Sequence, residues 1–209
     1  PQPINKDKNI LVFNGQIYNY DKLAYRSDSY FILDQYINHG LKFWKYIDGE
    51  YAILILDTSK KELIFLTDIF GTKPLFYSID NGNISVSSLK STLEFNQIKK
   101  IKKCTPNTIY VYNLETKSLE IKRNYFEFKT NQYKETFDDW NEAFIYSISK
   151  RFKEKNGEIL LPLSSGLDSG AIACALDLLK IKYHSFTFLK NENQNILIRR
   201  LIKRFIKSP

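Results

Sequence analysis

Hydrophobic and polar positions follow two different patterns along the chain, and the change falls near residue 128. From residue 9 to about 128, short runs rich in β-branched and aromatic residues alternate with turn signals, which is typical of antiparallel sheets. A polar stretch at 129–135 then leads into apolar residues at helical spacing and into a strand, helix, strand, helix succession. We therefore predict two domains, residues 1–130 and 131–209.

The first region predicts strands joined by tight hairpins. Strands are expected at the following runs: Ile10–Phe13, Tyr51–Leu56 and Leu63–Thr67. Hairpin connections are expected at these turn signals: 58–61, Asn81-Gly82 and 115–117. A helix is expected over Ser29–His39, because Gly40 supplies a stop after a mixed apolar stripe. Since Tyr51–Leu56 is apolar on both faces, we expect packing between layers rather than one sheet open to water.

The second region predicts an α/β arrangement. A helix is expected over 136–157, a strand at 159–163, a second helix to about Lys180 and a strand at Tyr183–Leu189. This succession implies a parallel sheet with right-handed crossovers. The final segment, 195–207, is a basic amphipathic helix. We interpret it as a helix packed on the sheet with a charged outer face, and a membrane-surface or nucleic-acid element is the alternative.

Composition narrows the class of protein. The 209 residues carry a net charge of +8, but the lysines are scattered and the dense cluster at 99–103 is short. We therefore expect a solvated surface and no nucleic-acid partner. No apolar stretch is long enough to span a bilayer and no signal peptide is recognisable, so we expect a cytoplasmic setting and no membrane partner. Cys104 and Cys174 are expected to be structural, Cys174 buried in its helix, and neither shows the spacing of a metal site.

The segment 163–169, of sequence LSSGLDS, carries the chemistry of the second region. It lies between a predicted parallel strand and a predicted helix, where free N–H groups and the helix dipole favour an anion. The serine hydroxyls add donors, and Asp168 beside a phosphate suggests a bridging Mg²⁺. The alternative is a plain turn with Asp168 as helix N-cap. The segment is not a Walker A loop, because it lacks Gly-Lys-Ser/Thr.

The stretch LSSGLDSGAIACAL, at 163–176, closely resembles the Ser-Gly-Gly-x-Asp-Ser loop of ATP-pyrophosphatase synthetases, in particular that of glutamine-dependent asparagine synthetases. Ser165 and Gly170 depart from this pattern, since they stand where the family usually has Gly and Ser. The resemblance implies Mg²⁺ at Asp168, held through the ATP phosphates. It also implies ATP binding by these residues: Leu163, Ser164, Ser165, Gly166, Asp168, Ser169 and, at the end of the next strand, Phe188.

The first region resembles the glutaminase domain of the same family. The stretch NGQIYN at 14–19 is similar to its Asn-Gly-Glu-Ile-Tyr-Asn motif, and 47–77 is similar to its Asp-Gly-x-Phe-Ala and Asp-x-x-Gly-x-Lys-Pro-Leu motifs. The resemblance covers nearly the whole chain, with both motif sets in order. It implies an α+β, N-terminal-nucleophile-hydrolase-like domain of layered antiparallel sheets at 1–130. At 131–209 it implies the start of an α/β parallel-sheet nucleotide-binding domain.

Glutamine binding is implied at Asn14, Gly15, Gln16 and Asp28. In the family the first two form the oxyanion hole that meets the tetrahedral intermediate of glutamine hydrolysis. Asp28 aligns with the acidic residue that holds the α-amino group of glutamine. The sequence alone leaves two alternatives open: a type I′ turn at Asn14-Gly15, expected just after its strand, and a plain N-cap role for Asp28.

The resemblance implies an N-terminal Cys nucleophile, and neither Cys104 nor Cys174 matches it. Because the sequence starts at Pro1, we expect a piece of a longer protein, truncated in both domains. The implied parent is an asparagine synthetase, which converts aspartate, glutamine and ATP to asparagine, glutamate, AMP and pyrophosphate, and which is a candidate homodimer. A related ATP-dependent cyclase or ligase, of the β-lactam synthetase or lasso-peptide type, and a degenerate non-catalytic homologue are the alternatives.

Overall fold

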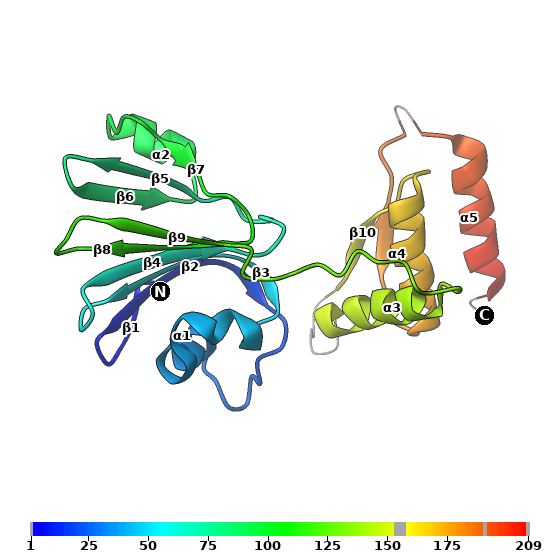
Figure 1. The fold of residues 1–209 in the computed structure, drawn as a ribbon. Helices are drawn as coiled ribbons and strands as arrows, with labels where there is room; N and C mark the ends of the chain where they lie inside the picture. The colour runs from blue at the N-terminus through cyan, green and yellow to red at the C-terminus, as the bar shows by residue number, and fades with distance from the viewer. Residues whose placement is uncertain (1, 153–157, 190–191, 208–209) are drawn as a thin grey trace. The chain divides into compact units, whose positions relative to one another are not determined.

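The computed structural model describes residues 2–152, 158–189 and 192–207. The chain divides into two compact units, Pro1–Thr130 and Asn131–Pro209 (Figure 1). In the described residues no helix is both long enough and apolar enough to cross a membrane.

The first unit consists of two antiparallel sheets with short helices. The larger sheet has six strands in the order β1-β2-β3-β4-β8-β9, and the smaller sheet has three in the order β6-β5-β7. The strands of the larger sheet are β1 Ile4–Lys6, β2 Asn9–Ile17, β3 Gly49–Asp57, β4 Glu62–Thr67, β8 Thr108–Asn113 and β9 Leu119–Arg123. Those of the smaller sheet are β5 Phe76–Asp80, β6 Asn83–Ser87 and β7 Lys102–Lys103. The helices are α1 Asp28–His39, the 3₁₀ helix η1 Gly40–Tyr46 and α2 Lys90–Phe95.

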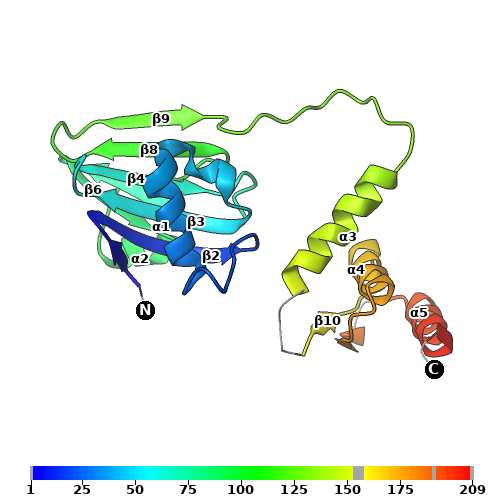
Figure 2. The same cartoon turned by 90° about the horizontal axis from the view of Figure 1, so that it is seen from below.

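The larger sheet buries side chains on both of its faces. Ile53 and Ile55 of β3 belong to a cluster shared with α1, which lies across this face (Figure 2). Ala52 belongs to a second cluster, which includes Phe65 of β4 and Tyr77 of the smaller sheet. Each large apolar side chain buried in this way stabilises the fold by about 1.5–3 kcal/mol. The layered packing predicted from the apolar run of β3 is therefore confirmed.

The hairpins lie at the predicted turn signals. Asn81 and Gly82 have φ angles of 50° and 74°, as a two-residue type I′ turn between β5 and β6 requires. Residues 58–61 connect β3 to β4, whose pairing begins with Asp57 opposite Glu62. Gly40 ends α1 with a φ of 56°, and its N–H donates to the carbonyl of Tyr36.

Strand β2 runs four residues beyond the predicted end at Phe13. Asn14 and Gly15 lie inside the strand, paired with Ala52 and Tyr51, so they form neither a turn nor the segment after a strand. A Cβ at position 15 would lie 2.1 Å from the carbonyl oxygen of Glu50, and Gly15 has a φ of 153°. Only glycine permits this close approach of β2 to β3, which is why an Asn-Gly pair continues the strand.

Among its described residues, the second unit has two short parallel strands and three α-helices. Its strands are β10 Leu160–Pro162 and β11 His184–Phe186, and its helices are α3 Asp138–Phe152, α4 Leu167–Leu178 and α5 Gln194–Lys207. β10 and β11 pair in parallel, as predicted, but each is shorter than the run expected from the sequence. The core of this unit includes Ile148 of α3, Leu161 of β10, Leu176 of α4 and Leu197 of α5.

The burial of two helices in this unit differs from the prediction. Cys174 is exposed, because the buried face of α4 carries Gly170, Ala173 and Leu176, and Cys174 is turned away from that face. Of the apolar residues at helical spacing on α3, Ile148 is buried, whereas Trp140 remains 60% exposed. The predicted end of α3, at 153–157, lies outside the described residues.

Candidate functional site

Asn14, Gly15 and Gln16, three of the residues predicted to bind glutamine, are consecutive in β2. The register between β2 and β3 is continuous, so side chains alternate between the faces of the sheet along β2. Phe13 and Ile17 are buried in the cluster shared with α1. The side chains of Asn14 and Gln16 therefore lie on the opposite face, with Asn14 exposed to solvent.

Asp28 is the first residue of α1 and is half-buried. The N-cap position belongs to Ser27, so the plain capping role considered for Asp28 falls one residue earlier. Because α1 packs on the face of the sheet opposite to the Asn14 side chain, the side chains of Asn14 and Asp28 are not brought together on one face of the sheet.

Asp68 holds the 68–73 turn in place beside β3. Its side chain is 3% exposed, and its carboxyl oxygens accept hydrogen bonds from N–H groups along the 68–73 turn. Thr72 donates from both its N–H and its hydroxyl, at 3.0 Å each to the nearer oxygen, and Phe70 donates at 3.0 Å. The N–H of Tyr51, the residue opposite Gly15, donates at 3.1 Å. Buried carboxyl groups require such partners, so Asp68 fixes the turn against β3.

Glu50 and Lys73 are charged residues that sequence reasoning did not assign to the site. Glu50 is the cross-strand partner of Gln16 and therefore lies on the Asn14 face. Lys73, at the end of the Asp68 turn, places its Nζ 3.7 Å from a Glu50 carboxylate oxygen, and each side chain is about one-third exposed. Glu50 and Lys73 thus form an ion pair on the face that carries the amide side chains of Asn14 and Gln16. In the sequence, Lys73 was marked only by its place in the Asp-x-x-Gly-x-Lys-Pro-Leu stretch.

Three other titratable groups of this unit are unsuited to catalysis. Burial raises the pKa of the Cys104 thiol to about 12, so it stays protonated at neutral pH. Burial likewise raises the pKa of Tyr51 to about 12 and raises that of Tyr125 further. The Tyr125 hydroxyl donates to the carbonyl of Thr67 at 2.9 Å. Both tyrosines are therefore neutral at neutral pH. Tyr51 is part of β3, and Tyr125 links the chain after β9 to β4.

In the second unit, the 163–169 segment connects the carboxyl end of β10 to the start of α4. Ser164 and Ser169 close it into a compact turn, since their hydroxyl oxygens are 2.8 Å apart and the N–H of Ser164 donates to the Ser169 hydroxyl at 3.0 Å. The N–H of Gly166 donates to the Ser164 hydroxyl at 3.1 Å. We call this segment the serine loop.

The predicted nucleotide residues differ in what they can offer a ligand. Leu163 is buried; its N–H donates to the carbonyl of Phe186, the last residue of β11, and its carbonyl accepts from the hydroxyl of Thr187. Its backbone is therefore already engaged. Phe188 is 78% exposed and forms an edge-to-face contact with Phe186. Asp168 lies exposed in the first turn of α4, and the N-cap is Gly166, not Asp168.

The residues present fit a Mg²⁺ held mainly by phosphate oxygens. In the part of the chain that the structure describes, no group of three His, Cys, Asp or Glu side chains forms a metal cluster. An exposed single carboxylate such as Asp168 matches the usual protein share of a magnesium site, in which phosphates and waters supply the other ligands.

Two charged side chains from later in the chain, Glu192 and Arg200, form hydrogen bonds with the serine loop. Neither of them was identified from the sequence. The Glu192 carboxylate accepts a hydrogen bond from the N–H of Ser165, and the hydroxyl and N–H of Ser165 together lower the pKa of Glu192. The Ser165 hydroxyl accepts one from the N–H of Asn193 at 3.2 Å. On the other side, Nη1 of Arg200 donates to the carbonyls of Ser164 and Gly166, the latter at 3.0 Å.

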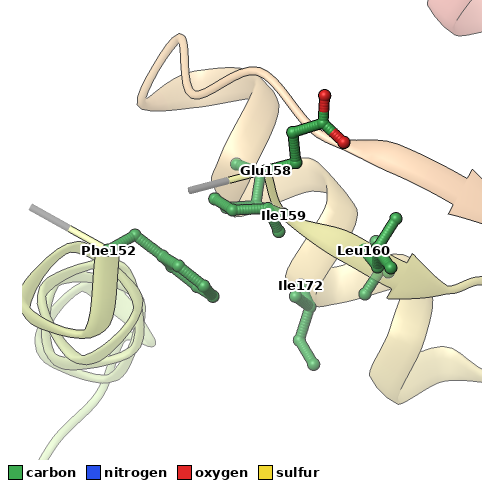
Figure 3. A pocket seen from close by; sticks show the side chains of 7 residues that line it. Phe152, Glu158, Ile159, Leu160 and Ile172 are labelled. Carbon is green, nitrogen blue, oxygen red and sulfur yellow. The ribbon is translucent and has the colours of Figure 1, made fainter. Parts of the chain in front are cut away.

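A small pocket of about 220 Å³ also lies in the second unit, among α3, β10 and α4 (Figure 3). Its described lining is apolar apart from Glu158 and consists of Phe152, Glu158, Ile159, Leu160, Leu161, Ile172 and Leu176. The serine loop contributes none of these described lining residues, because the pocket surrounds the start of β10 and the loop follows its end.

The first unit has the layered antiparallel architecture of an N-terminal-nucleophile-hydrolase-like glutamine amidotransferase fold. The solved structure of glutamine phosphoribosylpyrophosphate amidotransferase from B. subtilis aligns with 88% of this chain and 48% of its own, at a TM-score of 0.50 and 15% identity, which supports the fold alone. A family model described as glutamine amidotransferase domain matches residues 1–143. The chain belongs to this class II glutamine amidotransferase family.

Distant relatives of the chain are named asparagine synthetases. A putative glutamine-hydrolysing asparagine synthetase 1 of Methanocaldococcus jannaschii is 32% identical over 206 residues, covering 82% of this chain and 37% of the relative. A second putative synthetase of that organism is 26% identical and covers 94% and 46%. Asparagine synthetase 2 of Bacillus subtilis is 35% identical over 99 residues, or 42% of this chain and 13% of the relative. The chain thus spans less than half the length of these relatives.

Proposed function

We propose that the chain is part of an ATP-dependent, glutamine-hydrolysing asparagine synthetase. The parent protein would release ammonia from glutamine in its amidotransferase domain. It would then use ATP to activate the side-chain carboxylate of aspartate as an acyl-adenylate, with pyrophosphate as leaving group, and ammonia would attack that intermediate.

One observation carries this proposal. The alignment with the Methanocaldococcus relative covers 82% of the chain, more than the amidotransferase region at 1–143 can account for. It therefore extends into the second unit, where the serine loop follows a parallel strand and opens a helix. Strand, loop and helix N-terminus in this order form a favourable anion site.

In the amidotransferase unit, Asn14 and Gly15 are the proposed oxyanion donors. Asn14 presents its amide on an exposed position of a strand that is held on one side by β3, so little reorganisation would be needed during reaction. Gln16 and Asp28 are proposed to bind the rest of glutamine, Asp28 through the α-ammonium group.

In the second unit, Ser164, Ser165, Gly166 and Ser169 are proposed to bind the ATP phosphates, with Asp168 as the Mg²⁺ ligand. Bound Mg²⁺ would neutralise phosphate charge as pyrophosphate leaves. The exposed ring of Phe188 is proposed to contact adenine, and the backbone of Leu163 supports the loop instead of binding ATP directly.

A related ATP-dependent cyclase or ligase is the second candidate. It is supported by the same strand, serine loop and helix N-terminus, because activation of any carboxylate by ATP needs an anion site of this kind. Such an enzyme would activate a carboxylate with ATP but would need no ammonia from glutamine.

The test uses the full-length protein and measures pyrophosphate release from ATP with aspartate and either glutamine or ammonia. Asn14→Ala is expected to lower glutamine-driven synthesis about 100-fold, the scale of a lost oxyanion donor, and to spare ammonia-driven synthesis. Asn83→Ala, at an exposed strand position of the smaller sheet, is the matched control. Equal loss of both activities in Asn14→Ala would contradict a separate glutamine site.

Asp168→Asn is expected to abolish pyrophosphate release with either nitrogen source, because the magnesium ligand is removed. Asp177→Asn removes a charge from the last turn of the same helix and serves as the control. Unchanged release in Asp168→Asn would remove the metal assignment. If pyrophosphate is released only when another carboxylate substrate replaces aspartate, and no nitrogen donor is required, the cyclase or ligase replaces the synthetase.

A further inference from the structure

We propose that Arg200 is a positioning residue of the serine loop: by holding two loop carbonyls on one side, it aims the loop's N–H donors at an anion on the other. This inference rests on the proposed nucleotide role of the loop and adds a residue from α5, far away in sequence.

Arg200 binds two carbonyl groups of the serine loop. A single guanidinium nitrogen, Nη1, donates to the carbonyls of both Ser164 and Gly166. Both peptide units are trans, and in a planar trans peptide the N–H points opposite to the C=O. The N–H of Ser165 and that of Leu167 therefore point away from Nη1. Arg200 thus fixes the orientation of two peptide units that flank the turn.

Glu192 lies on the side of the serine loop to which the Ser165 N–H points. The N–H of Ser165 donates a hydrogen bond to the carboxylate of Glu192, and the hydroxyl and N–H of Ser165 together lower the pKa of Glu192. A negatively charged oxygen therefore already occupies the donor that Arg200 orients. A phosphate oxygen of similar charge would replace it, so Glu192 is a competitor for the same N–H group.

The absence of a side chain at Gly170 makes room for the Arg200 guanidinium. Gly170 is buried, and a Cβ at that position would lie 2.7 Å from Nη2 and 2.8 Å from Cζ of Arg200. The flat guanidinium can lie against the α4 backbone only because the side chain is absent. The position of Arg200 therefore depends on glycine at position 170, where the family usually has serine.

The experiment measures equilibrium binding of Mg²⁺-ATP, of inorganic pyrophosphate and of adenosine to the full-length protein. Arg200→Ala is expected to weaken ATP and pyrophosphate binding roughly tenfold, the scale of a charge-assisted hydrogen bond, and to leave adenosine binding unchanged. Arg200→Lys is expected to restore most of the loss, because an ammonium group can still donate to both carbonyls. Arg199→Ala, at the exposed neighbouring position of α5, is the control.

Two further variants test the geometry. Gly170→Ala is expected to reproduce Arg200→Ala, since the added methyl group displaces the guanidinium. Glu192→Gln is expected to tighten pyrophosphate binding about threefold, because a neutral amide competes less well with a phosphate. Unchanged or weaker binding in Glu192→Gln would contradict an anion at the Ser165 N–H.

The outcomes separate this inference from the proposed function. If the unmodified protein binds neither ATP nor pyrophosphate, the nucleotide role of the loop fails, and the inference with it. If it binds both and Arg200→Ala binds them equally well, the role of Arg200 alone is overturned. An equal loss of adenosine binding in Arg200→Ala would point to a merely structural role and would also overturn the inference.

Discussion

At the scale of single residues, the surroundings of a side chain decide its chemistry more than its type does. Cys104 and Cys174 have the same side chain but different surroundings: Cys104 is buried in the core between the two sheets, and Cys174 is exposed on α4. Gly15 and Gly40 both have positive φ, yet only Gly15 meets a neighbouring backbone. These pairs allow matched experiments.

The cysteine pair predicts selective labelling. Because burial raises the pKa of Cys104 to about 12, its thiol is protonated and inaccessible at pH 8, whereas Cys174 is open to reagent. A thiol-reactive probe added to the native protein should modify Cys174 and spare Cys104, as read by peptide mass spectrometry. Rapid native labelling of Cys104 would contradict its placement in the core, and labelling of both after denaturation is the control.

The glycine pair separates backbone strain from steric contact. Gly15→Ala is expected to reduce the free energy of unfolding by about 2–4 kcal/mol, because its Cβ would collide with the Glu50 carbonyl. Gly40→Ala should cost only about 1–2 kcal/mol, since its Cβ would meet open space and only the positive φ is unfavourable. Denaturant unfolding checks both values. Equal losses would contradict the close approach of β2 to β3 at Gly15.

At the scale of elements, polar side chains join strands and helices that are distant in sequence. Asp57, at the end of β3, is 5% exposed and accepts a hydrogen bond from the Tyr36 hydroxyl of α1 at 2.9 Å. It also accepts from the N–H of Lys60 at 3.0 Å and pairs with its Nζ at 3.2 Å. Asp68 similarly joins its turn to β3. These carboxyl groups tie the sheet to α1 and to the loop that carries Lys73.

Asp57 predicts a pH dependence of stability. Burial by itself would raise its pKa, but hydrogen bonds from Lys60 and Tyr36 outweigh burial and leave the pKa below its ordinary value. A carboxyl group with a lowered folded pKa contributes stability above its unfolded pKa, and this contribution is lost as the pH falls through the folded pKa. Asp57→Asn should therefore be less stable than the unmodified protein at pH 7, and the difference in Tm should shrink toward pH 3. A difference that grows on acidification would contradict this account.

Asp68 predicts a loss of order in its turn. Asp68→Ala would leave several N–H groups of the 68–73 turn and that of Tyr51 without their buried acceptor, at a cost of about 1–3 kcal/mol for each group that water cannot reach. We expect lower thermal stability and faster hydrogen exchange of amides in the turn. Asp80→Ala, at the exposed end of β5, is the control for removing one aspartate. Unchanged exchange in the turn would remove the role given to Asp68.

At the scale of the whole molecule, the chain is two compact units joined by a polar stretch. Every residue of 127–137 is exposed, and none of them belongs to a strand or helix. Each unit has its own apolar core. Such a stretch is the expected site of proteolytic cleavage, because exposed backbone outside regular structure adapts readily to a protease.

Limited trypsin digestion is expected to cut first after Lys129 or Lys134. The main products should be stable fragments that correspond to the two units, identified by mass spectrometry. Replacing both lysines with glutamine should slow the first cut and leave later cleavage unchanged. A first cut inside β3 or β4, or the simultaneous loss of both units, would show that the chain does not behave as two units.

The sequence alone determined the local elements of this protein. Alternating apolar runs predicted strands, Asn81-Gly82 predicted a hairpin, and Gly40 predicted the end of a helix. These features could be predicted because they depend on neighbouring residues only. It also indicated the change from antiparallel sheets to parallel strands, and it pointed to the serine loop as an anion site.

Only the tertiary structure decided which groups meet. Asn14-Gly15 has the local signature of a turn, and the pairing of β2 with β3 keeps it in a strand. Likewise, Glu192 and Arg200 reach the serine loop from 27 to 36 residues away in sequence. Such contacts depend on how separate elements pack, which no local pattern of residues records.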